Sequence, residues 1–504
     1  MVKKSFAIAG FLLLSAVLAF DGAEAREWTI VGPRALGMGG ANVAVANDAS
    51  ASYWNPAAYG FFKSSEGGDY GKRKWSAELD AGVGMQVHED LGEEINKIVA
   101  INFDNVKGVI SASNTADFIR IIDDLKTFND NKSRALTASL NGGLSIQVSH
   151  FGIGGYVFSD ISAKGSIDLV NIAPVSVSSA SGNLMTRLAT QTNFNGGVAF
   201  APGDYYFTAA QKTSMQSSLS SMGWSTADAA NYIQAVDYGL KQAQNSGTTI
   251  PADITTSILN VGQVAATAVN GGSLADNASE LLFRGIALAE VPLTYGYALT
   301  DAFAIGGNVK FMKARTYNVG VPVFNTDFSN ALSAAKNDYT DDQSLGLDLG
   351  MLYRFGDKAR VGFVGRNLNS PKFNMKPLFP GDDDNIKEKA QVRAGVAYKP
   401  ISLLILAVDY DLTRNDTTVS GDYKSQNLSG GIELNLLKIL QLRAGAYKNM
   451  AQQDIGIVYT AGLGLNLWVV NIDLGASLSP KSTAVDGNDI PKEVRAELAL
   501  SALF

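Results

Sequence analysis

The chain has 504 residues, no cysteine, two histidines and a formal net charge of −7. The lack of cysteine excludes disulfides, thiol catalysis and cysteine-based metal sites, and the acidic balance argues against a nucleic-acid partner. Glycine is abundant at 51 residues, whereas charged residues make up only 18% of the chain.

The first 25 residues have the features of a secretory signal peptide. Lys3 and Lys4 precede an apolar run over 6–20, and residues 23–25 form the A-x-A pattern that signal peptidase reads. The run is shorter than the roughly 20 residues of a membrane-spanning helix, so a retained anchor is the less favoured alternative. We expect cleavage before Arg26 and export. An exported chain of this composition is either a soluble periplasmic β-protein or an outer-membrane β-barrel.

The segment 26–74 is too long for a simple tail and lacks the alternation of a lipid-facing strand. It is rich in glycine but contains no phosphate-loop pattern. Pro56 fixes its own backbone and disfavours a helical conformation at Asn55, whose side chain can then bond neighbouring backbone groups and hold a tight turn. Such a turn could gate a channel, or it could be an ordinary turn.

The strongest signal is alternation of apolar and polar residues over segments of about 10 residues, as in strands with one face in lipid and the other in a polar lumen. The last of these segments ends on an aromatic residue, Phe504, which resembles the signal read by the outer-membrane assembly machinery. An even number of strands returns both ends of a single-chain barrel to the same side. The fourteen segments are 75–88, 136–149, 151–162, 283–299, 302–315, 343–355, 359–368, 389–399, 402–413, 426–436, 439–449, 455–467, 468–479 and 493–504.

The connections between these segments alternate in length. Those after the even-numbered strands are tight turns, and those after the odd-numbered strands are longer, as in barrels with short periplasmic turns and long outer loops. The sequence therefore predicts an all-β fold: a transmembrane antiparallel β-barrel of about 14 strands over 75–504. The long connections are 89–135, 163–282, 316–342, 369–388, 414–425, 450–454 and 480–492.

The longest connection, 163–282, has helical character. Residues 227–244 are rich in alanine with apolar residues on one face, Ser225 or Thr226 is a candidate N-cap, and Gly247 is a candidate stop. A second apolar stretch covers 254–269. We expect an extracellular, partly helical loop that caps the barrel mouth; a solvated surface excursion is the alternative.

Strand parity directs a set of charged residues into the lumen. Their mixed signs suit a packed ion-pair network that grips the segment 26–74, rather than an open pore of one sign; direct contact with a substrate is the alternative. The predicted network consists of Arg354, Arg366, Arg393, Asp409, Glu433, Arg443 and Asp473, with Lys310, Asp348, Arg360 and Asp411 at equivalent positions.

The stretch 32–60 contains the pattern GxxALGMGGA and the sequence Tyr53-Trp54-Asn55-Pro56-Ala57. It resembles the N-terminal plug of the FadL/OMPP1/TodX superfamily of outer-membrane β-barrels, and it is also similar to TraF-like conjugal-transfer proteins and PorV-like secretion proteins. The resemblance implies fourteen strands with 26–74 as a plug in the lumen. In the transporter branch it also implies a kink in the third strand that opens a side exit. The large loop of this chain follows the third strand. In the fatty-acid transporter, the helical loops that form the outer capture groove lie later in the chain, so we carry over no capture-site residues.

Adjacent glycines in the third strand, Gly154 and Gly155, predict a bulge that could open such an exit, with Asn55, Pro56 and Ala57 against it as the gate. Alternatively, the glycines make room for the plug. We expect passive uptake of hydrophobic small molecules, such as long-chain fatty acids or hydrocarbons. The alternative is a barrel that transports nothing and scaffolds a conjugation or secretion apparatus.

The remaining expectations concern chemistry and partners. No nucleophile motif accompanies His88 or His150, so a hydrolase is disfavoured and we expect no enzymatic activity, cofactor or metal. Besides a hydrophobic ligand, the expected partners are membrane lipid, lipopolysaccharide and the outer-membrane assembly machinery. We expect no nucleic acid, and a monomer in the bacterial outer membrane.

Overall fold

The computed structural model describes residues 26–62, 75–99, 115–168, 205–247, 249–250, 252–267, 278–322, 336–378, 382–419, 423–436, 439–467, 469–485 and 488–503. The predicted signal peptide 1–25, the end of the plug segment (63–74) and the predicted assembly signal Phe504 lie outside the described residues.

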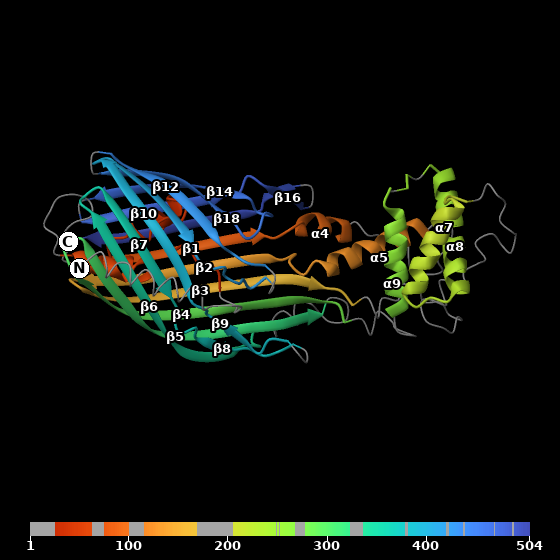
Figure 1. Cartoon of the computed structure of the whole chain (residues 1–504), viewed down its shortest axis with the longest axis horizontal. Coiled ribbons are helices and arrows are strands. Elements are labelled where there is room, and N and C mark those ends of the chain that lie inside the picture. Colours follow the sequence, from red (N-terminus) through yellow and green to blue (C-terminus); the bar gives the residue numbers. More distant parts are fainter. Residues whose placement is uncertain are drawn as a thin grey trace.

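Fourteen antiparallel strands close into a barrel, in which β1 pairs with both β2 and β18 (Figure 1). Each neighbouring pair is hydrogen-bonded in sequence order, so the predicted fold class is confirmed. The strands are β1 (Trp75–Val87), β2 (Leu136–Val148), β3 (Phe151–Ser166), β4 (Glu280–Ala298), β5 (Phe303–Pro322), β6 (Thr340–Phe355), β7 (Ala359–Arg366), β10 (Gln391–Ile401), β11 (Leu404–Asp411), β12 (Asn427–Leu436), β13 (Leu440–Asn449), β14 (Ile457–Leu467), β15 (Val470–Leu478) and β18 (Glu493–Leu503).

The two faces of the barrel wall differ in chemistry because successive side chains in a strand point to opposite faces. Large apolar side chains cover the outer face; Leu79, Leu293 and Leu498, for example, are 55%, 59% and 46% exposed. Charged and amide side chains occupy the inner face and are buried there. An apolar band outside and a polar interior inside are the arrangement of a barrel that spans a bilayer.

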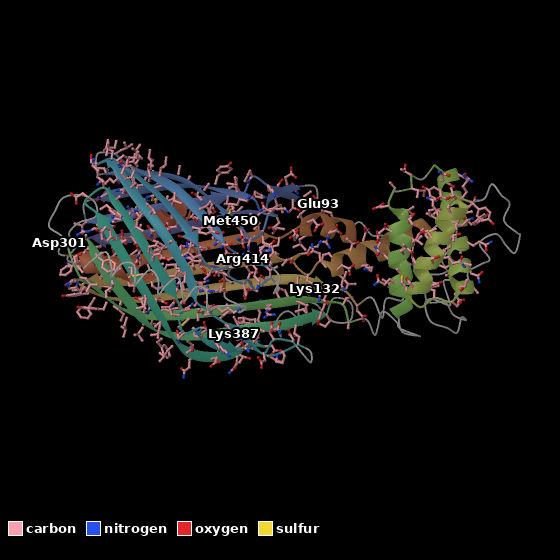
Figure 2. All side chains as sticks on the ribbon, viewed as in Figure 1. Glu93, Lys132, Asp301, Lys387, Arg414 and Met450 are labelled. Carbon is pink, nitrogen blue, oxygen red and sulfur yellow. The ribbon has the colours of Figure 1, made fainter. Side chains whose placement is uncertain are left out.

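Short turns lie at one end of the barrel and long connections at the other. In Figure 2 the turn residue Asp301 marks the short-turn end, whereas Lys387, Arg414 and Met450 lie toward the long-connection end. The described parts of the long connections contain two small hairpins and two helices that we did not predict. These are β8 (Lys372–Asn374) with β9 (Asn385–Lys387), β16 (Ser482–Val485) with β17 (Asn488–Pro491), α4 (Leu91–Val99) and α5 (Thr115–Asp130).

Where it is described, the longest connection forms three further helices: α7 (Ala209–Ser221), α8 (Thr226–Asn245) and α9 (Ile254–Thr267). Ser225 caps α8 as predicted, by accepting a hydrogen bond from the amide of Asp228. These helices share an apolar core with α5 that includes Trp224 and Tyr232. They stand beyond the barrel, with α4 and α5 between, rather than directly over its mouth (Figure 1). None of the described helices has the length and apolar character needed to cross a membrane.

Residues 26–62, the described part of the predicted plug, fold inside the barrel. Its elements are α2 (Pro33–Gly37), α3 (Ala51–Trp54) and the 3-10 helix η1 (Pro56–Phe61). Trp28 and Trp54 are at most 1% exposed, and they belong to one apolar cluster that includes side chains of the wall. The plug is therefore part of the core of the protein.

Candidate functional site: the plug and the barrel wall

Glycines on successive strands allow the plug backbone to touch the wall. A Cβ on Gly306 would lie 2.4 Å from the carbonyl carbon of Pro56, and one on Gly431 would lie 2.5 Å from the carbonyl oxygen of Met38. Contacts this close leave no room for any larger residue. We call these positions the glycine belt. It includes four cross-strand pairs: Gly296–Gly306, Gly362–Gly395, Gly431–Gly445 and Gly462–Gly475.

Asn55 is fully buried and joins three segments. Its Oδ1 accepts a hydrogen bond from the amide of Ala57 at 3.2 Å, which caps η1. Its Nδ2 donates to the carbonyl oxygens of Val43 at 3.2 Å and of Met351 at 3.1 Å, on β6. The side chain therefore holds the turn, the plug and the wall together. Pro56 packs against Gly296 of β4, Gly306 of β5 and Gly350 of β6, which also belongs to the glycine belt.

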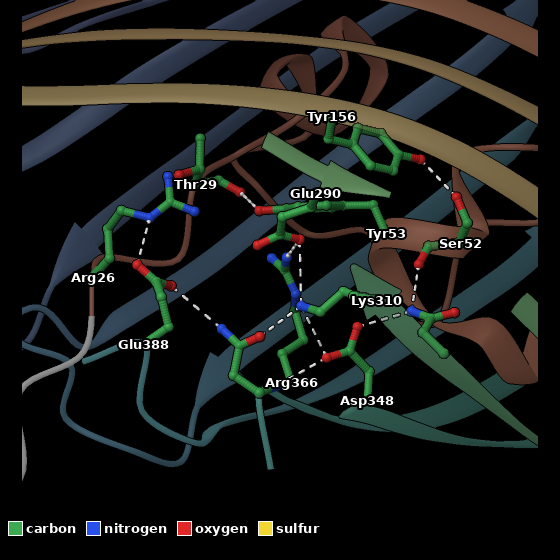
Figure 3. A network of polar contacts seen from close by, with 12 residues as sticks. Arg26, Thr29, Ser52, Tyr53, Tyr156, Glu290, Lys310, Asp348, Arg366 and Glu388 are labelled. Carbon is green, nitrogen blue, oxygen red and sulfur yellow. Dashed lines mark hydrogen bonds and ion pairs between the residues drawn. The ribbon is translucent and has the colours of Figure 1, made fainter. Parts of the chain in front are cut away.

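The plug also meets the wall through a buried network of charges, shown in Figure 3. Lys310 Nζ lies 3.3 Å from Glu290, 3.1 Å from Asp348 and 2.6 Å from the amide oxygen of Asn367. Arg366 pairs with the same Glu290 at 3.0 Å, and its guanidinium lies 4.0 Å from the ring centre of Tyr53 in the plug. The charges are thus paired with one another rather than exposed in an open channel.

Arg26, the first residue after the predicted cleavage site, extends this network from the plug side. It pairs with Asp160 at 2.9 Å and Glu388 at 3.2 Å. Glu388 lies in the connection before β10, and burial raises the pKa of its carboxyl, the Arg26 cation only partly opposing that rise. Sequence reasoning missed Arg26, Glu290 and Glu388. Glu290 could have been found because it shares the inward parity of β4.

The other predicted network residues also surround the plug. Asp409 accepts hydrogen bonds from the amides of Asn42 and Val43, and Glu433 holds both Arg34 of the plug and Arg443 of the wall. The remaining predicted residues contact wall carboxylates or rings of the plug. Arg443 pairs with Asp473, Arg393 pairs with Asp411 and lies over Trp28, and the half-buried Arg354 lies over the ring of Phe61.

The third strand differs from the prediction in two ways. The ladder between β3 and β4 is interrupted at Gly154 and Gly155, but the pairs on either side, Ile153 with Leu293 and Tyr156 with Glu290, keep the same register. The predicted bulge is therefore wrong. The interruption faces Pro292, which has no amide hydrogen to donate.

The residue of the plug that lies at this interruption is Ser52, and not the predicted gate Asn55-Pro56-Ala57. A Cβ on Gly154 would lie 2.8 Å from the Tyr156 ring and 3.5 Å from Ser52 Oγ. Ser52 Oγ donates to the carbonyl oxygen of Ala49 at 3.0 Å, so the Tyr156 hydroxyl donates to Ser52 at 2.6 Å. A Cβ on Gly155, on the outer face, would meet nothing within 4 Å.

A second polar cluster closes the long-connection end around His88. Its Nε2 lies 3.0 Å from Thr137 Oγ1 and its Nδ1 lies 3.8 Å from Asp454. Burial would raise the pKa of Asp454, but His88 and hydrogen bonds from the Glu89 amide and Tyr423 hydroxyl lower it to about 2. His88 is 1% exposed, and the two adjoining cavities of about 20 Å³ each hold little more than one water.

Comparison with known families assigns the chain. The family model described as "F plasmid transfer operon, TraF, protein" matches residues 52–411, which is most of the chain. The chain belongs to this TraF family. The resemblance to TraF-like proteins is thereby confirmed, and the match extends from α3 of the plug to the end of β11.

Among the curated proteins, none matches this TraF-family chain. Similar solved structures include the toluene transporter TbuX of Ralstonia pickettii, at 12% identity and a TM-score of 0.44, covering 94% of this chain and 98% of that one. The toluene transporter TodX of Pseudomonas putida is 12% identical at a TM-score of 0.42, with 93% and 97% covered. A FadL homologue of Pseudomonas aeruginosa is 12% identical at a TM-score of 0.41, with 96% and 99% covered.

Proposed function

We propose that this protein lies in the bacterial outer membrane and allows passive entry of hydrophobic small molecules, such as long-chain fatty acids or hydrocarbons. The observation that carries the proposal is the interrupted ladder at Gly154 and Gly155. It lies in the wall of a plugged barrel, where a plug residue, Ser52, covers it from inside. A molecule leaving sideways at this point would enter the bilayer directly.

The inner face near the interruption supports the same route. Phe158, Leu288 and Met312 present apolar side chains to the lumen on β3, β4 and β5, within a buried apolar cluster that also includes plug residues. Phe373 of the β8–β9 hairpin belongs to the same cluster. An apolar lining between the long-connection end and the interruption favours an alkyl chain or aromatic ring over a polar solute.

Pro292 lowers the cost of interrupting the ladder in a wall that faces lipid. Unpaired amides and carbonyls are not tolerated against hydrocarbon. Here one partner is a proline without an amide hydrogen, so fewer groups are left unpaired. Movement of Ser52 away from Tyr156 would then uncover the interruption without breaking a complete ladder.

A second candidate function is a scaffold for a conjugation or secretion apparatus. It is favoured by membership of a family described by a plasmid transfer operon and by the glycine belt, which holds the plug backbone tightly against the wall. In that case the plug would stay in place and the barrel would transport nothing.

Valine substitutions at the two glycines separate these functions. Gly154→Val would press against Tyr156 and Pro292 and fill the interruption, whereas Gly155→Val projects into open space on the outer face. We expect Gly154→Val to reduce uptake of radiolabelled oleate to the level of cells without the protein. The cells should have intact lipopolysaccharide, because pure lipid bilayers let fatty acids pass unaided.

Gly155→Val is the matched control, and we expect it to retain wild-type uptake. Both variants should show the heat-dependent gel mobility of a folded barrel. If wild-type cells take up no more oleate than empty cells, or if the two valine variants behave alike while folded, the uptake function is wrong and the scaffold becomes the better account.

A further inference from the structure

A large polar cavity lies at the short-turn end of the barrel, next to plug helix α2. Its volume is about 620 Å³, and its lining includes Pro33 and Arg34 of the plug. It is bounded by residues beside the β10–β11 turn and the β14–β15 turn, such as Ser402 and Asn471. We call it the vestibule. Nothing in the proposed uptake of hydrophobic molecules uses it.

The lining of the vestibule is unsuited to an apolar ligand. It contains no aromatic side chain, but it contains the side-chain amides of Asn435, Gln441, Asn466 and Asn471. The Oδ1 of Asn466 is buried without a hydrogen-bond partner among the described residues. Amide side chains both donate and accept hydrogen bonds, as a polypeptide backbone does. Sugar sites commonly stack the ring on an aromatic face, which is lacking here.

The vestibule is lined by two carboxyl groups that stand outside the ion pairs found among the described residues. The lining contains four carboxyl groups and three cationic side chains. Two of the cations, Arg34 and Arg443, pair with the same carboxylate, Glu433. Within the described residues Glu78 enters no ion pair. Asp48 accepts hydrogen bonds from the amide and hydroxyl of Ser50, and it too enters no ion pair with any residue that the structure describes. A ligand with positive charge would compensate both carboxylates.

We propose that the vestibule binds a basic segment of an extended polypeptide that enters from the short-turn side. Lysine or arginine side chains of the segment pair with Glu78 and Asp48, and its backbone bonds to the amide side chains of the lining. A segment bound there touches α2, so the partner contacts the plug itself. This proposal is independent of the uptake function, because it concerns the opposite end of the lumen and a polar ligand.

The test uses the full chain in detergent micelles and a fluorescent peptide of alternating glycine and lysine. Fluorescence anisotropy should show binding of this peptide and no binding of the same peptide with acetylated lysines. Glu78→Gln keeps the shape of the side chain and should weaken binding roughly tenfold. Asp489→Asn, an exposed carboxylate in β17 at the other end of the barrel, should leave binding unchanged.

A second measurement does not depend on the Glu78 variant. The chain contains no cysteine, so Ser402→Cys places a single thiol on the rim of the vestibule. The lysine peptide should slow labelling of this thiol by a charged thiosulfonate reagent, and the acetylated peptide should not. Equal binding of the two peptides, an equal effect of Glu78→Gln and Asp489→Asn, or unprotected labelling at Ser402→Cys would each overturn the proposal.

Discussion

Replacing Lys310 by alanine is expected to lower the free energy of unfolding by about 3–5 kcal/mol, the usual cost of removing one partner from a buried ion network. Lys310 and its partners Glu290 and Asp348 are each at most 2% exposed. Without the ammonium group, Asp348 loses its cation and Glu290 keeps only Arg366. Urea unfolding followed by tryptophan fluorescence measures the effect, since Trp28 and Trp54 are buried in the plug.

Arg315→Ala is the matched control on the same strand, β5. Arg315 pairs with Asp341 at 2.9 Å, but both side chains are 41% exposed. Because water screens such a pair, its loss should change the free energy of unfolding very little. If Lys310→Ala were as harmless as Arg315→Ala, the buried network would not hold the plug.

Replacing Leu498 by arginine is expected to cost roughly 2–4 kcal/mol in a bilayer, the range for a charge on the lipid face near the midplane. Leu498 is 46% exposed on the outer face and lies in the middle of β18, between Ala81 and Leu474 of the neighbouring strands. Unfolding from lipid vesicles, followed by heat-dependent gel mobility, measures the cost.

Val470→Arg tests the depth dependence of this effect. Val470 is also exposed on the outer face, at 42%, but it is the first residue of β15 at the short-turn end. An arginine there reaches the interface and should cost only about 0–1 kcal/mol. Equal tolerance of both substitutions would mean that this face does not lie against lipid.

The barrel could be predicted from sequence because alternation is a direct consequence of strand geometry. The inward positions of Asp409 and Glu433, for example, follow from parity alone, since one face of each strand must be apolar. The short turns were predictable for a related reason, because two adjacent alternating segments leave no residues for anything longer.

The parts that sequence reasoning missed depend on distant contacts or on short segments. The β8–β9 hairpin has strands of three residues, too short for any periodicity to appear. Helix α7 has little amphipathic pattern, although Thr208 and Gln211 form a capping box that could have indicated its start. The contact of Ser52 with Tyr156 joins residues that are 104 positions apart, and no local pattern reports it.

The placing of Asn55 and Pro56 against the third strand was wrong for the same reason. Asn55 and Pro56 are a conspicuous turn, but the turn serves to seat η1 on the glycine belt of β4 to β7. Some glycines of the third strand make room for the plug and others lie on the outer face, and the sequence alone could not separate the two kinds. Gly152 faces Tyr59 of the plug, whereas Gly155 faces outward.

The most direct test of the central claim is to lock the plug to the third strand. A Cβ on Gly154 would lie 3.5 Å from Ser52 Oγ, which is close to disulfide geometry, so Ser52→Cys with Gly154→Cys would supply the only two thiols of the chain. Cysteine adds one atom beyond Cβ where valine adds two, so Gly154→Cys alone sets the reference rate of uptake. Oleate uptake by cells with the oxidised pair should fall to background and return on reduction to the rate of Gly154→Cys alone, while each single cysteine variant should respond to neither treatment. Uptake at the wild-type rate with the disulfide intact would contradict the claim that the molecule leaves the barrel where Ser52 covers β3.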